Sequence, residues 1–177
     1  MRTKAAAIAG SAGFLVIAPG VVAGLVPWWL TGWQQGAAWP VPVRVAGGLL
    51  ITAGAATLLG SFAQFALEGR GTPAPPAPTE HLVVRGPYRY VRNPMYLAVL
   101  AVITGQALLL SRPVLFAYAA AVGCAFVAFV RWYEQPALTK RYGLSYETYL
   151  RTVPGWWPRL PRARTTPPPP ARDPGEH

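Results

Sequence analysis

The chain alternates long apolar runs with short polar segments, and the apolar runs have lengths typical of membrane-spanning helices. Uncharged or nearly uncharged stretches cover residues 5–30, 45–67, 95–110 and 114–130. A helix needs about 20 apolar residues to cross the hydrocarbon core of a bilayer, and the two shorter runs fit a tight helical hairpin. The pattern therefore predicts an all-α integral membrane protein with about four transmembrane helices.

Two basic residues, Arg2 and Lys4, precede the first apolar run, as they would in a signal peptide. The apolar core of a cleavable signal is usually about 7 to 15 residues long. Because the run over residues 5–30 is longer than this, we expect a membrane span rather than a signal.

Small residues four positions apart recur within the apolar runs. Such pairs allow membrane helices to approach closely, because packing rather than hydrophobicity drives helix association in lipid. The pairs are Ala56 and Gly60, Ala101 and Gly105, and Ala119 and Gly123. We expect them to lie at helix–helix contacts.

The pattern changes after the fourth apolar run. Pro136 is expected to begin a new helix at a changed angle, and Ser145 to cap a short helix that lies along the membrane surface. Residues 161–177 contain four consecutive prolines and no large apolar residue, which predicts a disordered tail. The expected organisation is therefore one membrane domain over residues 1–160 followed by that tail.

The charge of the chain is strongly positive, with sixteen Lys and Arg against six Asp and Glu. In a soluble protein this balance would suggest nucleic acid, but here the basic residues flank apolar runs. We therefore expect anionic lipid headgroups as partners and no nucleic acid. In the four-span arrangement only Arg44 and Arg112 fall on one side and the other fourteen on the opposite side, which predicts that both termini are cytoplasmic.

Neither a disulfide nor a metal site is expected. Cys124 is the single cysteine and lies within an apolar run, where an inert buried thiol is the simplest interpretation. The two histidines, His81 and His177, are too few and too far apart to form a zinc site.

Residues 81–96 form a polar, basic and aromatic stretch between a proline-rich segment and the third apolar run. The predicted topology places this stretch on the cytoplasmic face and places Glu134, at the end of the fourth span, near Asn93 and Tyr96. Ionisable groups near the membrane interior are costly and tend to be functional. Glu134 is thus a candidate site residue, with an ion pair to Arg131 as the structural alternative.

The other residues of this stretch each have two interpretations. His81 could donate a hydrogen bond or shuttle a proton, or could be structural. The arginines, among them Arg92, could hold a carboxylate or phosphate, or could contact lipid headgroups. Asn93 and Pro94 fit a helix start, with Asn93 as the cap. The tyrosines could line a pocket or form an interfacial belt.

The motifs resemble those of a known family. The segment His81 to Tyr88, the segment Arg92 to Tyr96, then Glu134 and the ending Tyr142 to Pro154, are similar to the isoprenylcysteine carboxyl methyltransferase family. The C-terminal core of that family is in turn similar to phospholipid N-methyltransferases. The resemblance covers residues 80–160. It implies an integral-membrane enzyme that binds S-adenosylmethionine at the cytoplasmic ends of its last helices.

The resemblance also implies which residues form the cofactor pocket, although it names no catalytic residue. Within the pocket, His81, Tyr88 and Arg92 are candidates for the amino-acid end of the cofactor, and Glu134 for its polar groups. The full set carried over is His81, Val83, Gly86, Tyr88, Arg92, Asn93, Pro94, Tyr96 and Glu134.

Two positions depart from the family pattern. Members often have His where this chain has Asn93, and a pair of glutamates where it has Glu134 and Gln135. The expected acceptor is lipophilic or lipid-anchored, with carboxyl O-methylation and amine N-methylation both open. Two other functions remain as alternatives: a non-catalytic membrane binding or scaffold protein that keeps the fold, and a membrane reductase of related architecture that binds a nicotinamide cofactor.

Overall fold

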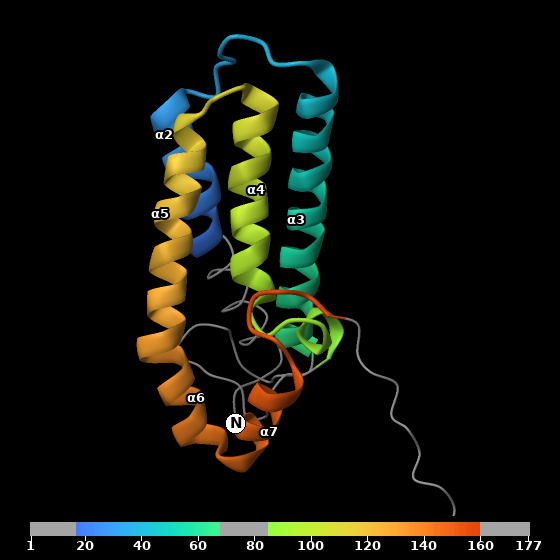
Figure 1. The fold of residues 1–177 in the computed structure, drawn as a ribbon, viewed down its shortest axis with the longest axis vertical. Helices are drawn as coiled ribbons and strands as arrows, with labels where there is room; N and C mark the ends of the chain where they lie inside the picture. Colours follow the sequence, from blue (N-terminus) through green and yellow to red (C-terminus); the bar gives the residue numbers. More distant parts are fainter. Residues whose placement is uncertain (1–16, 68–84, 160–177) are drawn as a thin grey trace, which may run out of the picture.

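The computed structural model describes residues 17–67 and 85–159, and every regular element in these two segments is helical (Figure 1). The predicted tail over residues 161–177 and the start of the first predicted span lie outside the described residues. The elements are η1 (Val21–Leu25), α2 (Val26–Thr31), α3 (Val41–Leu67), η2 (Gly86–Arg89), α4 (Pro94–Leu110), α5 (Val114–Phe129), η3 (Val130–Glu134), α6 (Gln135–Tyr142) and α7 (Leu144–Thr152). The all-α prediction is confirmed for the described part.

Two of the described helices are long and apolar enough to cross a membrane. These are Val41–Gln64, with 22% of its apolar window buried, and Val114–Tyr142, with 17% buried. The core helix of a soluble protein would be mostly buried, so such low burial favours lipid as the surrounding solvent. Ile17–Thr31 and Pro94–Leu110 are shorter apolar helices, so helix length supports two spans, and the count of four stays a prediction.

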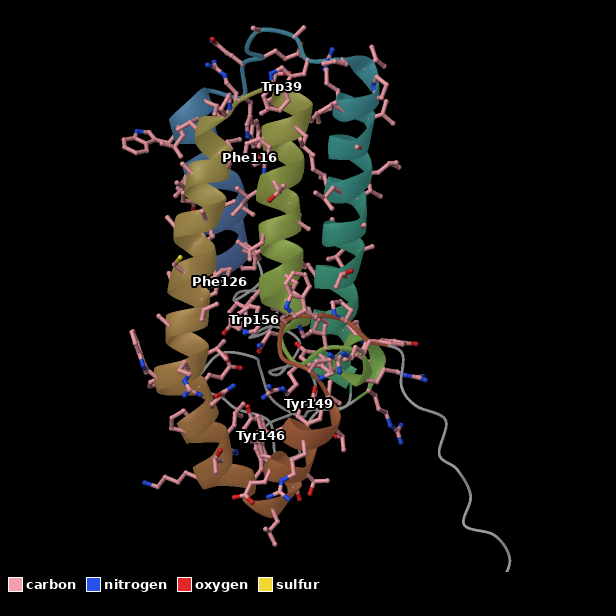
Figure 2. All side chains as sticks on the ribbon, viewed as in Figure 1. Trp39, Phe116, Phe126, Tyr146, Tyr149 and Trp156 are labelled. Atoms are coloured by element: carbon pink, nitrogen blue, oxygen red, sulfur yellow. The ribbon has the colours of Figure 1, made fainter. Side chains whose placement is uncertain are left out.

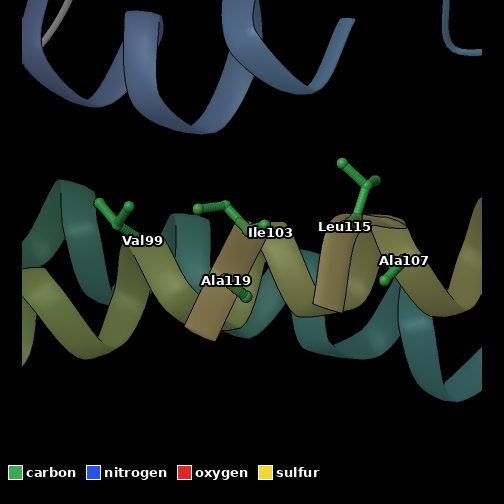
Figure 3. Close-up of a cluster of buried hydrophobic side chains, with 5 residues drawn as sticks. All are labelled: Val99, Ile103, Ala107, Leu115 and Ala119. Carbon is green, nitrogen blue, oxygen red and sulfur yellow. The ribbon is translucent and has the colours of Figure 1, made fainter. Parts of the chain in front are cut away.

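Helix α4 is the centre of the bundle, since it contacts α3, α5 and η1 (Figure 1). Its buried side chains Val99, Ile103 and Ala107 pack with Leu115 and Ala119 of α5 to form the apolar core (Figure 3). The connection between α4 and α5 is the predicted tight hairpin, and the bounds of both helices agree with the predicted runs within one residue.

Glycines set the close contact between α3 and α4. A Cβ atom on Gly47 would lie 2.7 Å from the Gly105 carbonyl oxygen, and one on Gly54 would lie 2.8 Å from the Ala98 carbonyl oxygen. Gly105 is therefore at a helix contact as predicted. The pair of Ala56 and Gly60 is not, because a Cβ on Gly60 would meet nothing within 4 Å. The spacing is right, but it lies on a face of α3 that is turned away from α4.

The first helix contains a π turn, η1, two residues before Pro27. The Val26 N–H bonds to the Val21 carbonyl, and proline has no N–H to give, so the carbonyls of Val22 and Ala23 lose their α-helical partners. Side chains from two other helices replace them: Tyr118 Oη donates to Val22 O at 2.8 Å and Gln106 Nε2 donates to Ala23 O at 2.7 Å. These bonds fasten the first helix to the core.

The fourth helix does not end at Val130. It continues through the π turn η3 into α6, which begins at Gln135, and the Gln135 N–H bonds to the Val130 carbonyl. The helix predicted to begin at Pro136 is present as α6, with the proline in its first turn, but it follows η3 directly because the widened turn accommodates the proline without a break.

The predicted short helix is present as α7, but Ser145 does not cap it. The cap position is Gly143, whose φ of +50° suits a residue without a side chain, and Ser145 lies inside the first turn. The two tyrosines of α7, Tyr146 and Tyr149, are buried rather than exposed on its surface.

The two ends of the bundle differ in charge. At the end with the α4–α5 hairpin (Figure 1), Arg112 Nε donates to Gln34 O at 2.9 Å and Arg44 Nε donates to Leu109 O at 3.3 Å. Trp39 and Phe116 stack there with ring centroids 6.1 Å apart (Figure 2). All other described Lys and Arg residues lie toward the opposite end, which agrees with the predicted charge separation along the chain.

Candidate functional site

Four segments that are distant in sequence meet at the more basic end of the bundle (Figures 1 and 2). They are the loop around η2, the first turn of α4, the π turn η3, and the chain from α7 to Arg159. Polar and aromatic side chains from all four face one another, and this arrangement is the candidate site.

A hydrogen bond between a phenol and a carboxylate joins α4 to η3. Tyr96 Oη donates to Glu134 Oε2 at 2.8 Å. Tyr96 is in the first turn of α4, and the extra residue in the π turn changes the face of the helix on which Glu134 lies. The prediction that Glu134 lies near Tyr96 is confirmed. Within the described segments Glu134 accepts its hydrogen bond from Tyr96, and the side chain of Arg131 is exposed.

Aromatic rings surround this pair. The ring centroid of Tyr96 is 4.6 Å from that of Phe126 on α5 and 6.3 Å from that of Trp156. Tilted aromatic pairs at such distances are favourable and hold one another in place. Tyr96, Phe126 and Trp156 are each separated by 30 positions in the sequence, so distant parts of the chain build this aromatic wall.

A second hydrogen bond fastens α7 to the η2 loop, where Tyr149 Oη donates to the Tyr88 carbonyl oxygen at 2.6 Å. Burial raises the pKa of the Tyr88 phenol well above its ordinary value of 10.0, and the nearby charge of Glu134 adds to the shift. Burial likewise raises the pKa of Tyr149, although Arg92 nearby opposes the shift. Both phenols are neutral hydrogen-bonding groups at physiological pH.

Residues Val153–Arg159 cross the loop that contains Arg92, and we refer to them as the strap. The Arg92 N–H donates to the Pro154 carbonyl at 2.9 Å, and the Arg159 N–H donates to the Tyr90 carbonyl at 3.1 Å. The strap thus lies directly on the loop, held by backbone bonds that do not depend on side-chain identity.

Two buried donors beneath the strap have no acceptor within the described segments. They are Arg92 Nε and Asn93 Nδ2. Leaving a buried donor unsatisfied costs about 1–3 kcal/mol, and more when the group is charged. Asn93 occupies the predicted N-cap position of α4, but its side chain makes no capping hydrogen bond. The predicted capping role therefore does not explain why the side chain is an amide.

The site holds opposite charges that do not pair with each other. Burial raises the pKa of Tyr146; nearby Arg92 lowers it and Glu134 raises it, so both charged groups lie close to this phenol. No ion pair joins Arg92 to Glu134 in the described structure. A positive group and a negative group are therefore held apart across the site.

The structure brings together five of the predicted residues: Tyr88, Arg92, Asn93, Tyr96 and Glu134. Gly86, with φ of +58°, turns the loop against Gln64 of α3, and Pro94 opens α4. His81 and Val83 lie outside the described residues. Arg89 is exposed and its guanidinium lies 5.0 Å from the Tyr90 ring, away from the buried donors.

Several site residues were not identified from the sequence, namely Phe126, Gly155 and Trp156, together with Ser61, whose hydroxyl hydrogen-bonds the Tyr88 side chain. Of the tryptophan pair at 156 and 157, only Trp156 packs near Tyr96, whereas Trp157 is 80% exposed. The described segments contain no cluster of His, Cys, Asp and Glu that could hold a metal ion.

Comparison with known proteins gives one finding. A family model described as phospholipid methyltransferase matches residues 43–145, a segment that runs from the start of α3 to the beginning of α7 and includes Glu134. No curated protein and no solved structure matches the chain. The strap lies beyond the matched segment.

Proposed function

The chain belongs to the phospholipid methyltransferase family, and from this premise we propose that it transfers a methyl group from S-adenosylmethionine to a lipophilic or lipid-anchored acceptor. This family comprises membrane methyltransferases related to the isoprenylcysteine carboxyl methyltransferases. The observation that carries the proposal is the site at one end of the membrane helices, where the Tyr96–Glu134 pair lies beside two buried donors that lack acceptors.

We further propose that four helices cross the membrane, with the site and both termini on the cytoplasmic side. The shorter helix α4 is about 25 Å long at 1.5 Å per residue, slightly less than the hydrocarbon thickness. Its neighbours α3 and α5 enclose it, so its ends need not reach both headgroup layers. The excess of basic residues at the site end supports the cytoplasmic assignment.

The residues present fit S-adenosylmethionine as the methyl donor. Its amino-acid end carries a carboxylate and an ammonium group, which suits a site that holds Arg92 and Glu134 apart. Aromatic rings beside Glu134 suit a positively charged group. The proposed binding set is Gly86, Tyr88, Arg92, Asn93, Pro94, Tyr96 and Glu134, with His81 and Val83 in the segment before them.

When bound, the donor supplies a methyl group that its sulfonium has already activated, so the protein has to align the two reactants and exclude water. In this mechanism Tyr96 fixes the orientation of the Glu134 carboxylate, and Phe126 and Trp156 shield it from solvent. A carboxylate acceptor needs no base, whereas an amine must first lose a proton. For an amine acceptor, Glu134 is the carboxylate of the described site that could accept this proton. The acceptor would enter from the lipid between the helices.

Calorimetric titration of the purified chain with S-adenosylmethionine tests this function. Saturable binding is expected, whereas a well-folded sample that binds no donor would exclude the methyltransferase and leave the scaffold and reductase functions. Binding of a nicotinamide cofactor instead would identify a reductase. Mass spectrometry of lipid extracts from cells with and without the protein should then reveal an acceptor that is heavier by one methyl group.

A further inference from the structure

Gly155 of the strap faces Arg92 and Asn93, the two side chains that each carry one donor without an acceptor, Arg92 Nε and Asn93 Nδ2. A Cβ atom added to Gly155 would lie 3.1 Å from Arg92 Nη2 and 3.8 Å from Asn93 Nδ2. The space next to this glycine is therefore bordered by the guanidinium on one side and by the amide on the other. Any side chain at position 155 would fill it.

The donors are buried too deeply for solvent to satisfy them. Asn93 is only 7% exposed, and both Arg92 Nε and Asn93 Nδ2 are inaccessible and lack acceptors in the described segments. The first turn of α4, which starts at Pro94, adds the partial positive charge of a helix N-terminus. Positive potential and a buried donor without an acceptor on each of these two side chains favour an anionic oxygen as the partner.

We propose that Arg92, Asn93 and Gly155 form an oxyanion-binding cradle, in which Arg92 and Asn93 donate to the anionic group of the ligand and Gly155 leaves the space that this group occupies. The two backbone bonds of the strap hold the glycine over the donors. The strap is thus a positioning element of the site, although it lies outside residues 43–145 that match the family model.

The cradle rests on the proposed function for its ligand, and two sources share the required chemistry. One is the carboxylate of the methyl donor, and the other is the phosphate of a phospholipid acceptor. Each belongs to a zwitterion whose ammonium group would lie toward Glu134, since Arg92 and Glu134 both lie close to Tyr146 and are not paired with each other.

The test uses the full chain in detergent micelles and calorimetric titration with three probes. These are S-adenosylhomocysteine, its analogue without the carboxylate, and a short-chain phosphatidylethanolamine. Gly155→Ala should weaken the probe that uses the cradle by about tenfold or more, since it displaces a charged hydrogen bond. Asn93→Asp, which puts a competing carboxylate into the same space, should weaken the same probe. Gly60→Ala is the matched control, because a Cβ there meets nothing within 4 Å.

The pattern across probes identifies the source. If the donor carboxylate occupies the cradle, Gly155→Ala weakens S-adenosylhomocysteine and leaves the analogue without the carboxylate unchanged. If a lipid phosphate occupies it, only the phospholipid is weakened, and this arm holds even if the chain binds no S-adenosylhomocysteine and the proposed function fails. Wild-type affinities for all three probes in both folded variants would overturn the cradle while leaving the proposed function intact. Thermal unfolding of each variant verifies that it is folded.

Discussion

The two π turns of this chain have the same local origin and opposite surroundings. Turn η1 ends at Leu25, two residues before Pro27, and η3 ends at Glu134, two residues before Pro136. In each, the widened turn relieves the clash between the proline ring and the preceding carbonyls. Because both turns have a proline at the same position, the difference between their roles must come from the side chains that pack against each turn.

Turn η1 is closed by its neighbours, whereas η3 opens onto the site. The carbonyls that η1 leaves free receive hydrogen bonds from Tyr118 and Gln106. At η3 the neighbouring helix contributes Tyr96, which bonds to the side chain of Glu134 rather than to the backbone. In this bundle a proline in an apolar helix thus produces either a fastening point or a site, depending on whether neighbouring donors reach the backbone or a side chain.

The largest expected effect is at the open turn. Glu134→Gln keeps the shape of the side chain and removes its charge, so affinity for S-adenosylhomocysteine should fall by ~10- to 100-fold, the range for one charged hydrogen bond. Calorimetric titration measures this loss. Glu147→Gln on α7 is the control and should bind like the wild type, because the hydrogen bond between Tyr96 and Glu134 does not involve Glu147. Unchanged affinity for Glu134→Gln would show that η3 is not part of a binding site.

At the closed turn the expected effect is on stability and not on binding. Gln106→Leu leaves the Ala23 carbonyl without its donor inside the bundle and should lower the free energy of unfolding by ~1–2 kcal/mol. Unfolding in mixed micelles, followed by circular dichroism, gives this value. In Thr52→Val, which removes an exposed hydroxyl bonded to its own helix, the change should stay within ~0.5 kcal/mol. Equal stabilities of the two variants would contradict the fastening role of η1.

Much of the fold could be predicted from the apolar runs, since the predicted runs 45–67, 95–110 and 114–130 agree with α3, α4 and α5 except at their ends. The predicted topology, supported by the distribution of basic residues, also placed Glu134 near Tyr96, as the structure does. The orientation of α3 could not be predicted, because small residues lie on more than one of its faces and the sequence does not say which face meets α4. The strap was missed because its bonds to the loop are between backbone groups, which leave no pattern in residue types.

A smaller effect is expected for Tyr96→Phe, which removes the donor to Glu134 but keeps the aromatic contacts with Phe126 and Trp156. The carboxylate keeps its charge and loses only its fixed orientation. Affinity for S-adenosylhomocysteine should fall by roughly two- to tenfold, as for one neutral hydrogen bond. If the loss equalled that of Glu134→Gln, orientation rather than charge would be the function of the pair.

The smallest effect concerns high pH. Because burial raises the pKa of Tyr88 and Tyr149 above 10.0 in the folded protein, the unfolded chain loses these protons first. Their contribution to stability is complete below pH 10 and declines as the pH rises above it. Hydrogen exchange should therefore show the site end loosening above pH 10 before η1 does. Tyr149→Phe should reduce this pH dependence, and an identical profile would exclude Tyr149 as its source.

The backbone bonds of the strap also set an order of events during biosynthesis. Residues 153–159 are translated after all the described membrane helices, and domains of a growing chain fold from the N-terminal side onward. The helices can therefore be inserted and packed while the loop around Arg92 still lacks its cover. The site of a newly made molecule is completed last, once the bundle that supports it is already in the bilayer.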